Sequence, residues 1–413
     1  MKSSVLSFVL FLLISLSLNA QTLTCDCKAD LDFLIEKLKK MPSYKKQIKG
    51  EKKDDFNAIY KRLSKQMTES ISIETCFALL KEQMMLINDN HAKIYFNHEY
   101  FALEDYDNED KRDSFINSER FKTHPKASQS VNTLIENLQQ KPQDDIEGIY
   151  KYGSQITVGI YYTSPTEIEG VILTSKAAIW RPGQVKFTAK KNAYGKFDML
   201  SYDDKTKKLR MIKGLTFANG RLKSFKKVGN NNNYELADKH DSNWVFKQLR
   251  DDIQYVYFGD FSSFSTANRK AFKSFYEAHK NTFNAKHIIV DLRNNGGGNS
   301  KLSDPFIKLF KKSKANIYVV TNSFTGSNSE QFTVKLKKIN GTKHVGQSTF
   351  GVVAYGLNYG TTYTTPSGYF DVLPTDMNFH KYYPYEGKGV TPDITLDFDS
   401  DWIEQIIEMI DTK

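Results

Sequence analysis

The spacing of apolar and polar positions divides most of the chain into three parts. From Lys28 to Ile87 the period is helical, because ADLDFLIEKLKKM places Leu31, Phe33, Leu34 and Leu38 near one stripe and ETCFALLKEQMMLI repeats the spacing. Between Phe101 and Asp145 the composition turns polar and irregular. We therefore expect residues 21–142 to form an N-terminal helical domain and a connector.

A period of two follows, which is typical of strands with one buried face. ITVGIYY alternates Ile156, Val158, Ile160 and Tyr162, and QVKFTA continues with Val185 and Phe187. Turn residues separate these runs, among them the pair Asn219-Gly220, a strong hairpin signal. The pattern predicts an antiparallel β domain at residues 143–233, a small barrel or curled sheet, that ends in a loop of four asparagines.

From residue 234 to 413, apolar runs alternate with amphipathic ones. Strands IQYVYFGDF, HIIVDL, NIYVVTN and HVGQS are separated by helices STANRKAFKSFYEAH, KLSDPFIKLFKK and SEQFTVKLKKI. Because the strands are almost continuously apolar, we expect helices on both faces of their sheet. The sequence thus predicts a multidomain α+β protein whose C-terminal domain is layered α/β.

The first twenty residues, MKSSVLSFVLFLLISLSLNA, have the form of a secretory signal peptide. The apolar run is shorter than the roughly 20 residues of a membrane span, and the residues before Cys25 are too large for a lipidation site. We expect an exported protein, periplasmic or extracellular, without stable membrane insertion after cleavage. An oxidising compartment favours one disulfide, in which Cys76 pairs with either Cys27 or Cys25.

Charge and composition exclude further classes of function. The formal charge is +10, but the lysines are interleaved with acids along the whole chain, so a solvated surface explains them better than a nucleic-acid groove. The three cysteines are too few for a metal cluster, and no histidine or acidic pair has a recognised ligand spacing. We expect no metal and no cofactor.

One stretch, HIIVDLRNNGGGNS, follows a strand with three consecutive glycines. Such a loop suits either a phosphate or an oxyanion, but the spacing matches no nucleotide-binding motif. Further along, VVTNSFTGSNSEQF places Ser327 between a strand end and a helix start, where nucleophiles sit. Ser327 with Glu330 also fits a capping box, and taken alone this stretch favours the capping role.

Four motifs occur in order: VDLRNNGGG, TGSNSE, VGQSTFG and GKGVTPDI. Together with the upstream segment INDNHAKIYF, they make the region from about Ser242 to Ser400 resemble the C-terminal processing, or tail-specific, serine peptidases. This superfamily includes the tricorn core protease and the retinoid-binding modules of the eye. The resemblance implies a crotonase-like domain of stacked ββα units and a peptide or protein as substrate.

The resemblance also implies roles for individual residues. Ser327 corresponds to the nucleophile, His91 to the base of the tricorn-like branch, and Glu386 to the carboxylate that orients the histidine or stabilises its charge. The backbone amides of Gly297 and Asn328 correspond to the oxyanion hole. These assignments predict a secreted endopeptidase with a Ser-His-Glu arrangement.

Two positions depart from the family pattern. Val352 stands where the Ser-Lys branch has its lysine, and Asn90 stands where tricorn-like enzymes have a serine before the histidine. These departures leave two other readings open: a weakly active or inactive relative that binds apolar ligands or peptides, and a structural or adhesive envelope protein. The oligomeric state stays open.

Overall fold

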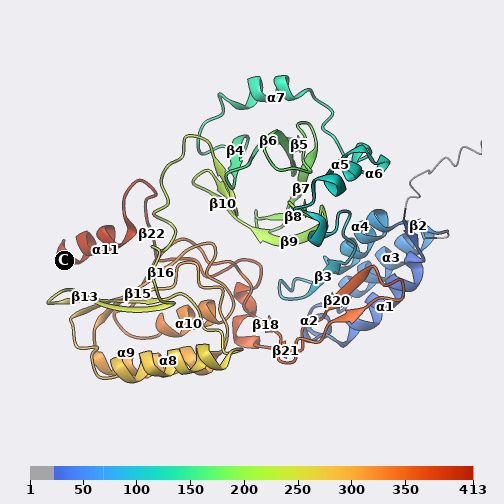
Figure 1. Cartoon of the computed structure of the whole chain (residues 1–413). Helices are drawn as coiled ribbons and strands as arrows, with labels where there is room; N and C mark the ends of the chain where they lie inside the picture. Colours follow the sequence, from blue (N-terminus) through green and yellow to red (C-terminus); the bar gives the residue numbers. More distant parts are fainter. Residues whose placement is uncertain (1–22, 68, 413) are drawn as a thin grey trace, which may run out of the picture.

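The computed structural model describes residues 23–67 and 69–412, and the predicted signal peptide, Met1 to Ala20, lies outside them. The architecture is α+β in several parts: a helical unit, a curled antiparallel sheet, and a mixed sheet flanked by helices (Figure 1). Within the described ranges, no helix has both the length and the apolar character that crossing a bilayer requires.

The N-terminal unit contains α1 (Cys27–Lys40), α2 (Pro42–Gln47), α3 (Glu51–Lys65) and α4 (Ile73–Met84). The Asp26 and Ser72 side chains cap α1 and α4 by accepting first-turn amides. The predicted stripe of α1 buries its three leucines completely: Leu31, Leu34 and Leu38. Phe33 is only half-buried, and Ile35 lies on the inner face in its place.

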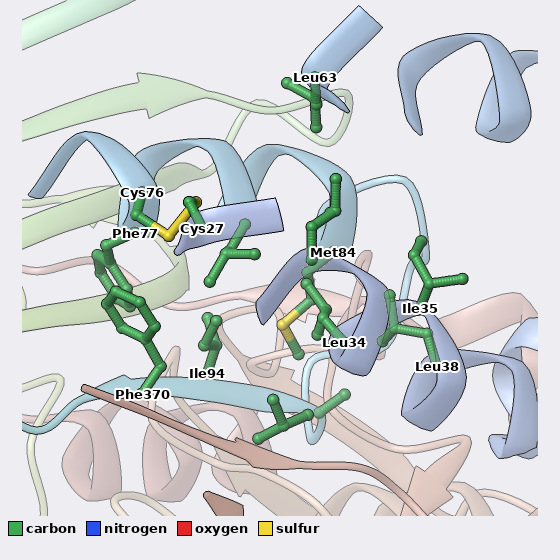
Figure 2. Close-up of a cluster of buried hydrophobic side chains, with 14 of the residues drawn as sticks. Cys27, Leu34, Ile35, Leu38, Leu63, Cys76, Phe77, Met84, Ile94 and Phe370 are labelled. Atoms are coloured by element: carbon green, nitrogen blue, oxygen red, sulfur yellow. A yellow bond between two sulfur atoms is a disulfide. The ribbon is translucent and has the colours of Figure 1, made fainter. Parts of the chain in front are cut away.

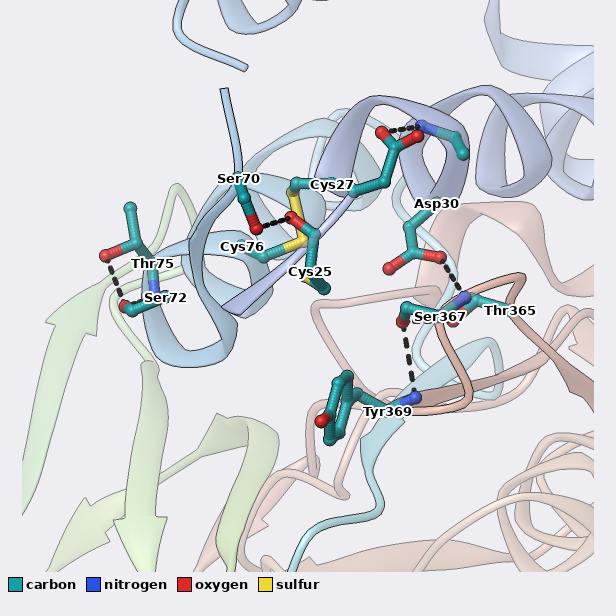
Figure 3. The surroundings of a disulfide bond; sticks show 12 residues. Cys25, Cys27, Asp30, Ser70, Ser72, Thr75, Cys76, Thr365, Ser367 and Tyr369 are labelled. Carbon is teal, nitrogen blue, oxygen red and sulfur yellow. Dashed lines mark hydrogen bonds between the residues drawn. A yellow bond between two sulfur atoms is a disulfide. The ribbon is translucent and has the colours of Figure 1, made fainter. Parts of the chain in front are cut away.

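A disulfide joins Cys27, the first residue of α1, to Cys76 of α4 (Figure 3). The partner of Cys76, which the sequence left open between Cys25 and Cys27, is therefore Cys27. Cys25 is a buried free thiol whose sulfur lies within 4.8 Å of the Cys76 sulfur and of an Asp30 carboxylate oxygen. Burial, with the nearby charges of Asp30 and Asp26, raises the pKa of Cys25 to about 12, so this thiol stays protonated.

Nine strands form one antiparallel sheet that curls into an almost closed ring (Figure 1). They are β4 (Gly148–Tyr152), β5 (Ile156–Ser164), β6 (Glu167–Ser175), β7 (Val185–Lys191), β8 (Phe197–Tyr202), β9 (Leu209–Leu215), β10 (Phe217–Ala218), β11 (Arg221–Leu222) and β12 (Phe225–Lys227), in the order β10-β11-β12-β4-β5-β6-β7-β8-β9. The predicted alternation is confirmed, because Val158 and Ile160 are buried inside the ring. Asn219 and Gly220 form the β10–β11 turn with positive φ angles of 48° and 60°.

The C-terminal sheet has six strands in the order β13-β14-β15-β16-β17-β22. They are β13 (Trp244–Arg250), β14 (Ile253–Phe258), β15 (His287–Asp291), β16 (Asn316–Thr321), β17 (Lys343–Gly346) and β22 (Ile394–Thr395). All neighbours are parallel except β13 and β14. β13 was not expected, since several of its side chains are exposed and the apolar pattern is weak.

Helices cover both faces of this sheet, as the apolar strands predict (Figure 1). Phe272 of α8 (Thr266–His279), Phe306 of α9 (Ser300–Ser313) and Phe332 of α10 (Asn328–Leu336) share one core. Trp402 and Ile406 of α11 (Trp402–Asp411) belong to the core on the other face. The strand ends therefore have fixed positions, and the loops that follow them are held on a rigid base.

A small sheet joins distant parts of the chain. β20 (Phe370–Leu373) pairs with β3 (Lys93–Phe96) on one side and with β19 (Tyr363–Thr364) on the other, all antiparallel. Phe370 is buried in the core of the N-terminal helices, where its ring stacks 5.9 Å from that of Phe77 (Figure 2). A C-terminal segment thus completes an N-terminal core.

Shorter elements connect these units. They are β1 (Thr24–Cys25), β2 (Ile71–Ser72), η1 (Leu103–Asp105), α5 (Glu109–Asn117), α6 (Glu119–Lys122), α7 (Val131–Leu138), β18 (Tyr355–Gly356), β21 (Met377–Asn378) and η2 (His380–Tyr385).

Candidate active site

Ser327 stands where a strand passes into a helix. β16 ends at Thr321, and α10 begins at Asn328 with Ser327 as its N-cap. The backbone of Ser327 has φ 55° and ψ −123°, a region that residues other than glycine rarely occupy. Strain of this kind costs about 1–3 kcal/mol and is concentrated at functional sites. The sharp strand-to-helix turn is the local geometry that exposes a nucleophilic hydroxyl.

Glu330 supports this turn from the inside. Its Oε2 accepts the N–H groups of Ser327 and Val352, both at 2.9 Å, and its Oε1 accepts the Gly351 N–H at 2.7 Å and the Thr349 hydroxyl at 2.5 Å. Burial raises the pKa of Glu330, and these hydrogen bonds oppose the shift. The capping box is present, so capping and the exposed nucleophile position coexist at Ser327.

His91 lies beside Ser327 although the two residues are far apart in the sequence. Its Nε2 lies 3.1 Å from the Ser327 Oγ across 236 positions of sequence. Burial lowers the pKa of His91 to about 4; Asp89 opposes this shift, and the charges of Lys93 and Lys213 add to it. The imidazole is therefore neutral near pH 7 and can accept the serine proton. Its Nδ1 is buried and has no hydrogen-bond partner among residues 23–67 and 69–412.

Asp89 fixes the loop that carries His91, and the sequence reasoning did not identify it. Its Oδ1 accepts the N–H groups of His91 and Ala92, both at 3.1 Å, while its Oδ2 accepts the Thr375 hydroxyl at 2.6 Å. The Asp89 carbonyl also accepts a hydrogen bond from the Lys213 ammonium at 2.8 Å. An aspartate two residues before the histidine is the signal of such a turn, but Thr375 and Lys213 join it only through the tertiary fold.

Glu386 is buried beside this loop but contacts the main chain before His91. Its Oε1 accepts the Asn90 N–H at 3.0 Å, and its Oε2 accepts the N–H groups of Val353 at 2.8 Å and Ala354 at 2.7 Å. Burial raises the pKa of Glu386 to about 7, although these amides oppose the shift. The Asn90 side chain donates to the Gly351 carbonyl at 3.1 Å. Asn90 therefore links the carboxylate to the histidine loop through its backbone.

Two of the three consecutive glycines lie against other parts of the backbone. A methyl group on Gly297, which has φ +103°, would lie 2.6 Å from the Ser327 Cβ, and one on Gly298 would lie 2.1 Å from the Phe261 carbonyl oxygen. Close approach of main chains thus explains these two glycines. The Gly297 N–H donates to Asn295 Oδ1 at 2.9 Å. The Asn328 N–H, in the first turn of α10, has no intrahelical acceptor.

A cleft of about 730 Å³ opens onto Ser327 and His91. Gly296, Phe350 and Val352 also line this cleft, as do residues of β3 and β9. Val352, which stands where the resemblance to the Ser-Lys branch implies a lysine, lines this cleft. The side chain at hydrogen-bond distance from the Ser327 hydroxyl is the His91 imidazole.

Comparison with known proteins agrees with the motifs. The sequence model of peptidase family S41 matches residues 252–316 and 307–396, a region that contains Gly297, Ser327 and Glu386 but not His91. A sequence search of functionally characterised proteins gives no match.

The chain also resembles solved structures at low identity. A lipoprotein from Streptococcus agalactiae is 12% identical, with 96% of this chain and 99% of that one covered and a TM-score of 0.40. The photosystem II D1 C-terminal processing protease is 14% identical, with 92% and 96% covered and a TM-score of 0.36. The tricorn protease is 13% identical, with 93% of this chain but 36% of that one covered and a TM-score of 0.41.

Proposed function

Because residues 252–396 belong to peptidase family S41 and the chain is thus a serine peptidase, we propose that it is a secreted endopeptidase that uses Ser327, His91 and Glu386. The observation that carries this proposal is the 3.1 Å contact between His91 Nε2 and Ser327 Oγ. Two residues this far apart in sequence meet at hydrogen-bond distance, within a cleft and on a strained turn. Peptides or proteins are the substrates.

In the proposed reaction, Ser327 Oγ attacks the peptide carbonyl carbon while His91 Nε2 takes the hydroxyl proton. The imidazolium then returns this proton to the leaving amine, so that an acyl-enzyme ester remains on Ser327. Water enters, His91 removes its proton, and the ester is hydrolysed with Ser327 restored. Burial of the neutral imidazole keeps the base form available well below neutral pH.

The carboxylates of Glu386 and Asp89 act on His91 without a hydrogen bond to its ring. Glu386 holds the Asn90 N–H and thereby the position of the next residue, His91. The negative charges of Glu386 and Asp89 favour the imidazolium that forms during the reaction, because electrostatic interactions are strong in a buried site. Glu386 is thus a positioning and charge-stabilising residue in this proposal, without a direct bond to the ring.

The Asn328 N–H and the Gly297 N–H are proposed to stabilise the oxyanion. The first of these amides belongs to the helix N-terminus, whose dipole favours negative charge. The second donates to Asn295 Oδ1 at 2.9 Å, so it must exchange this acceptor for the substrate oxygen. We also propose that the C-terminal domain is crotonase-like and that the protein is exported.

One set of observations favours the alternative of a weakly active peptide- or ligand-binding protein. His91 Nδ1 has no acceptor among the described residues, and the Gly297 amide is already occupied. A serine-reactive fluorophosphonate separates the two functions. Covalent labelling of the wild type that disappears in Ser327→Ala supports the enzyme, whereas an unlabelled wild type that still binds peptides supports the alternative.

Replacement of the nucleophile is the direct test of the proposal. We expect Ser327→Ala to lower peptide hydrolysis roughly 10⁴-fold or more, because the acyl-enzyme can no longer form. The assay compares kcat/KM of both proteins on a peptide that the wild type cleaves, with circular dichroism to confirm folding. Hydrolysis by the variant within about tenfold of wild type would refute the role of Ser327.

A further inference from the structure

The cleft beside Ser327 has an excess of positive side chains. Its lining contains five cations and two carboxylates: Lys93, Lys208, Arg210, Lys213 and Lys223, with Glu99 and Asp371. The cations come from β3, from β9 and the residue before it, and from the turn between β11 and β12. Several elements of the fold therefore contribute positive side chains to the cleft that contains Ser327.

Most of these cations are available to a ligand. Lys93, Arg210 and Lys223 are exposed, and Lys208 is half-exposed. Within residues 23–67 and 69–412, Lys93 and Lys223 have no hydrogen bond or ion pair from their ammonium groups. Arg210 alone of this exposed set has a carboxylate partner, Asp203, at 2.7 Å.

The exposed cations also act on one another electrostatically. Desolvation, together with the positive charges of Arg210 and Lys93, lowers the pKa of Lys223. Lys93 is two residues from His91 and begins β3. Like charges close to each other cost free energy unless an anion joins them. The arrangement has the electrostatic form of an anion-binding wall.

On the basis of the proposed peptidase function, we propose that the cleft selects peptides with aspartate or glutamate side chains close to the scissile bond, and that Lys93, Arg210 and Lys223 determine this preference. Carboxylates of the substrate would pair with these cations while the main chain lies at Ser327. Complementary charge raises both the rate of encounter and the discrimination among partners.

The arrangement favours side-chain carboxylates over the single carboxylate of a peptide C-terminus. A terminal carboxylate is a single group, whereas these three cations come from three separate elements that line the cleft. Several negative charges along an extended segment match such a distribution better. The proposal therefore concerns acidic internal sequences.

The test begins with wild-type enzyme and a mixture of peptides from a digested proteome, in which cleavage sites are mapped by mass spectrometry. One cleaved acidic sequence is then synthesised with an amidated C-terminus, in an Asp/Glu form and in the isosteric Asn/Gln form. We expect kcat/KM to be about tenfold higher for the acidic form at low salt, with a smaller ratio at high salt. Equal rates for the two forms overturn the proposal.

Charge-reversal variants test which residues determine the preference for acidic peptides. Lys223→Glu and Arg210→Glu are each expected to reduce the ratio of kcat/KM for the acidic peptide to kcat/KM for the neutral peptide about fivefold. One exposed ion pair between enzyme and substrate contributes at most about a factor of this size. Lys151→Glu is the matched control, since Lys151 is exposed on β4 of the same sheet and does not line the cleft. An unchanged ratio in Lys223→Glu and Arg210→Glu, or an equal loss in Lys151→Glu, overturns the assignment.

Two further outcomes separate this inference from the function on which it rests. If no peptide is cleaved, the proposed peptidase activity itself fails. If peptides are cleaved but the rate depends only on a free C-terminal carboxylate and not on acidic side chains, the activity stands and the acidic preference is overturned.

Discussion

At the scale of single residues, the site depends on a few backbone positions as much as on reactive side chains. Gly297 and Ser327 touch through atoms that leave no space for a methyl group, and Glu330 ties the serine turn to the loop at residues 349–352. Ser327, the proposed nucleophile, is therefore positioned by its surroundings before any substrate binds, which is a requirement for efficient electrostatic catalysis.

Gly297→Ala tests this close approach. A methyl group at this residue would lie 2.6 Å from the Ser327 Cβ and 2.8 Å from the Asn328 nitrogen, so we expect the oxyanion site to be displaced and kcat to fall roughly 10²-fold or more. Gly296→Ala is the stability control, because a methyl group there meets nothing within 4 Å. Thermal melting should show a loss for Gly297→Ala only. Wild-type kcat in that variant would contradict the proposed geometry.

The two buried titratable groups predict the dependence of activity on pH. His91, with its pKa lowered to about 4, is the neutral base at every pH above that value, and Glu386, with its pKa raised to about 7, becomes negative only as pH rises through neutrality. We therefore expect kcat/KM to rise with pH in two steps, near pH 4 and near pH 7.

Glu386→Gln assigns the upper step. The amide cannot ionise, so the step near pH 7 should disappear while the step near pH 4 remains. The glutamine side chain has only one acceptor oxygen, so either the Asn90 N–H or the N–H groups of Val353 and Ala354 lose their acceptor, and kcat should be lower at all pH values. A profile that keeps both steps in this variant would exclude Glu386 as the ionising group.

At the scale of elements, the sequence predicts regular structure well and local pairing less well. The helical stripe of α1, the alternation in β5 and the Asn219-Gly220 turn are confirmed because each follows from periodicity or turn chemistry over a few residues. Phe33 and β13 were less predictable, since an amphipathic or partly exposed segment gives a weak pattern. The pairing of β3 with β20 depends on residues almost three hundred positions apart, which no local signal encodes.

The disulfide belongs to this scale because it joins two helices of the unit that supports His91. We expect Cys76→Ser to lower the free energy of unfolding by about 2–5 kcal/mol and to reduce activity, since α4 leads directly to the His91 loop. Chemical denaturation and kcat/KM measure the two effects. Activity equal to wild type would show that the cross-link does not steady the approach of His91.

The free thiol provides the matched comparison. Because the Cys25 sulfur lies within 4.8 Å of the Cys76 sulfur, Cys27→Ser should form a Cys25–Cys76 disulfide and lose less stability than Cys76→Ser. Mass spectrometry of peptides from the alkylated, unreduced protein identifies the pairing. A Cys27→Ser protein with two free thiols would contradict this expectation.

At the scale of the whole molecule, the candidate site exists only where separate units meet. The roles of Ser327, His91 and Glu386 follow from the resemblance to a family, because the strand-to-helix pattern alone favours a capping role for Ser327. The contacts of Asp89 with Thr375 and of Lys213 with the Asp89 carbonyl come from units that the sequence treats separately. Sequence therefore identifies the residue types, whereas the fold determines which of their atoms meet.

Phe370→Ala tests the coupling between units. Phe370 is fully buried in the N-terminal core, and its strand pairs with the one that follows His91. We expect the free energy of unfolding to fall by about 3–5 kcal/mol and kcat/KM to fall as β3 shifts, although Phe370 does not line the cleft. Phe264→Ala is the control, since this side chain is 95% exposed. Lost stability with unchanged activity would show that β20 has no part in placing His91.

The pairing of β3 with β20 also determines at what stage of synthesis the candidate site can form. His91 precedes both the strand that pairs with β3 and the Glu386 carboxylate that accepts the Asn90 N–H by almost three hundred residues, so it is synthesised before either of them. A chain that ends before residue 370 lacks the strand that pairs with β3, so we expect it to be inactive in the proposed reaction. This order of synthesis would keep the proposed hydrolytic activity off while the chain is still growing.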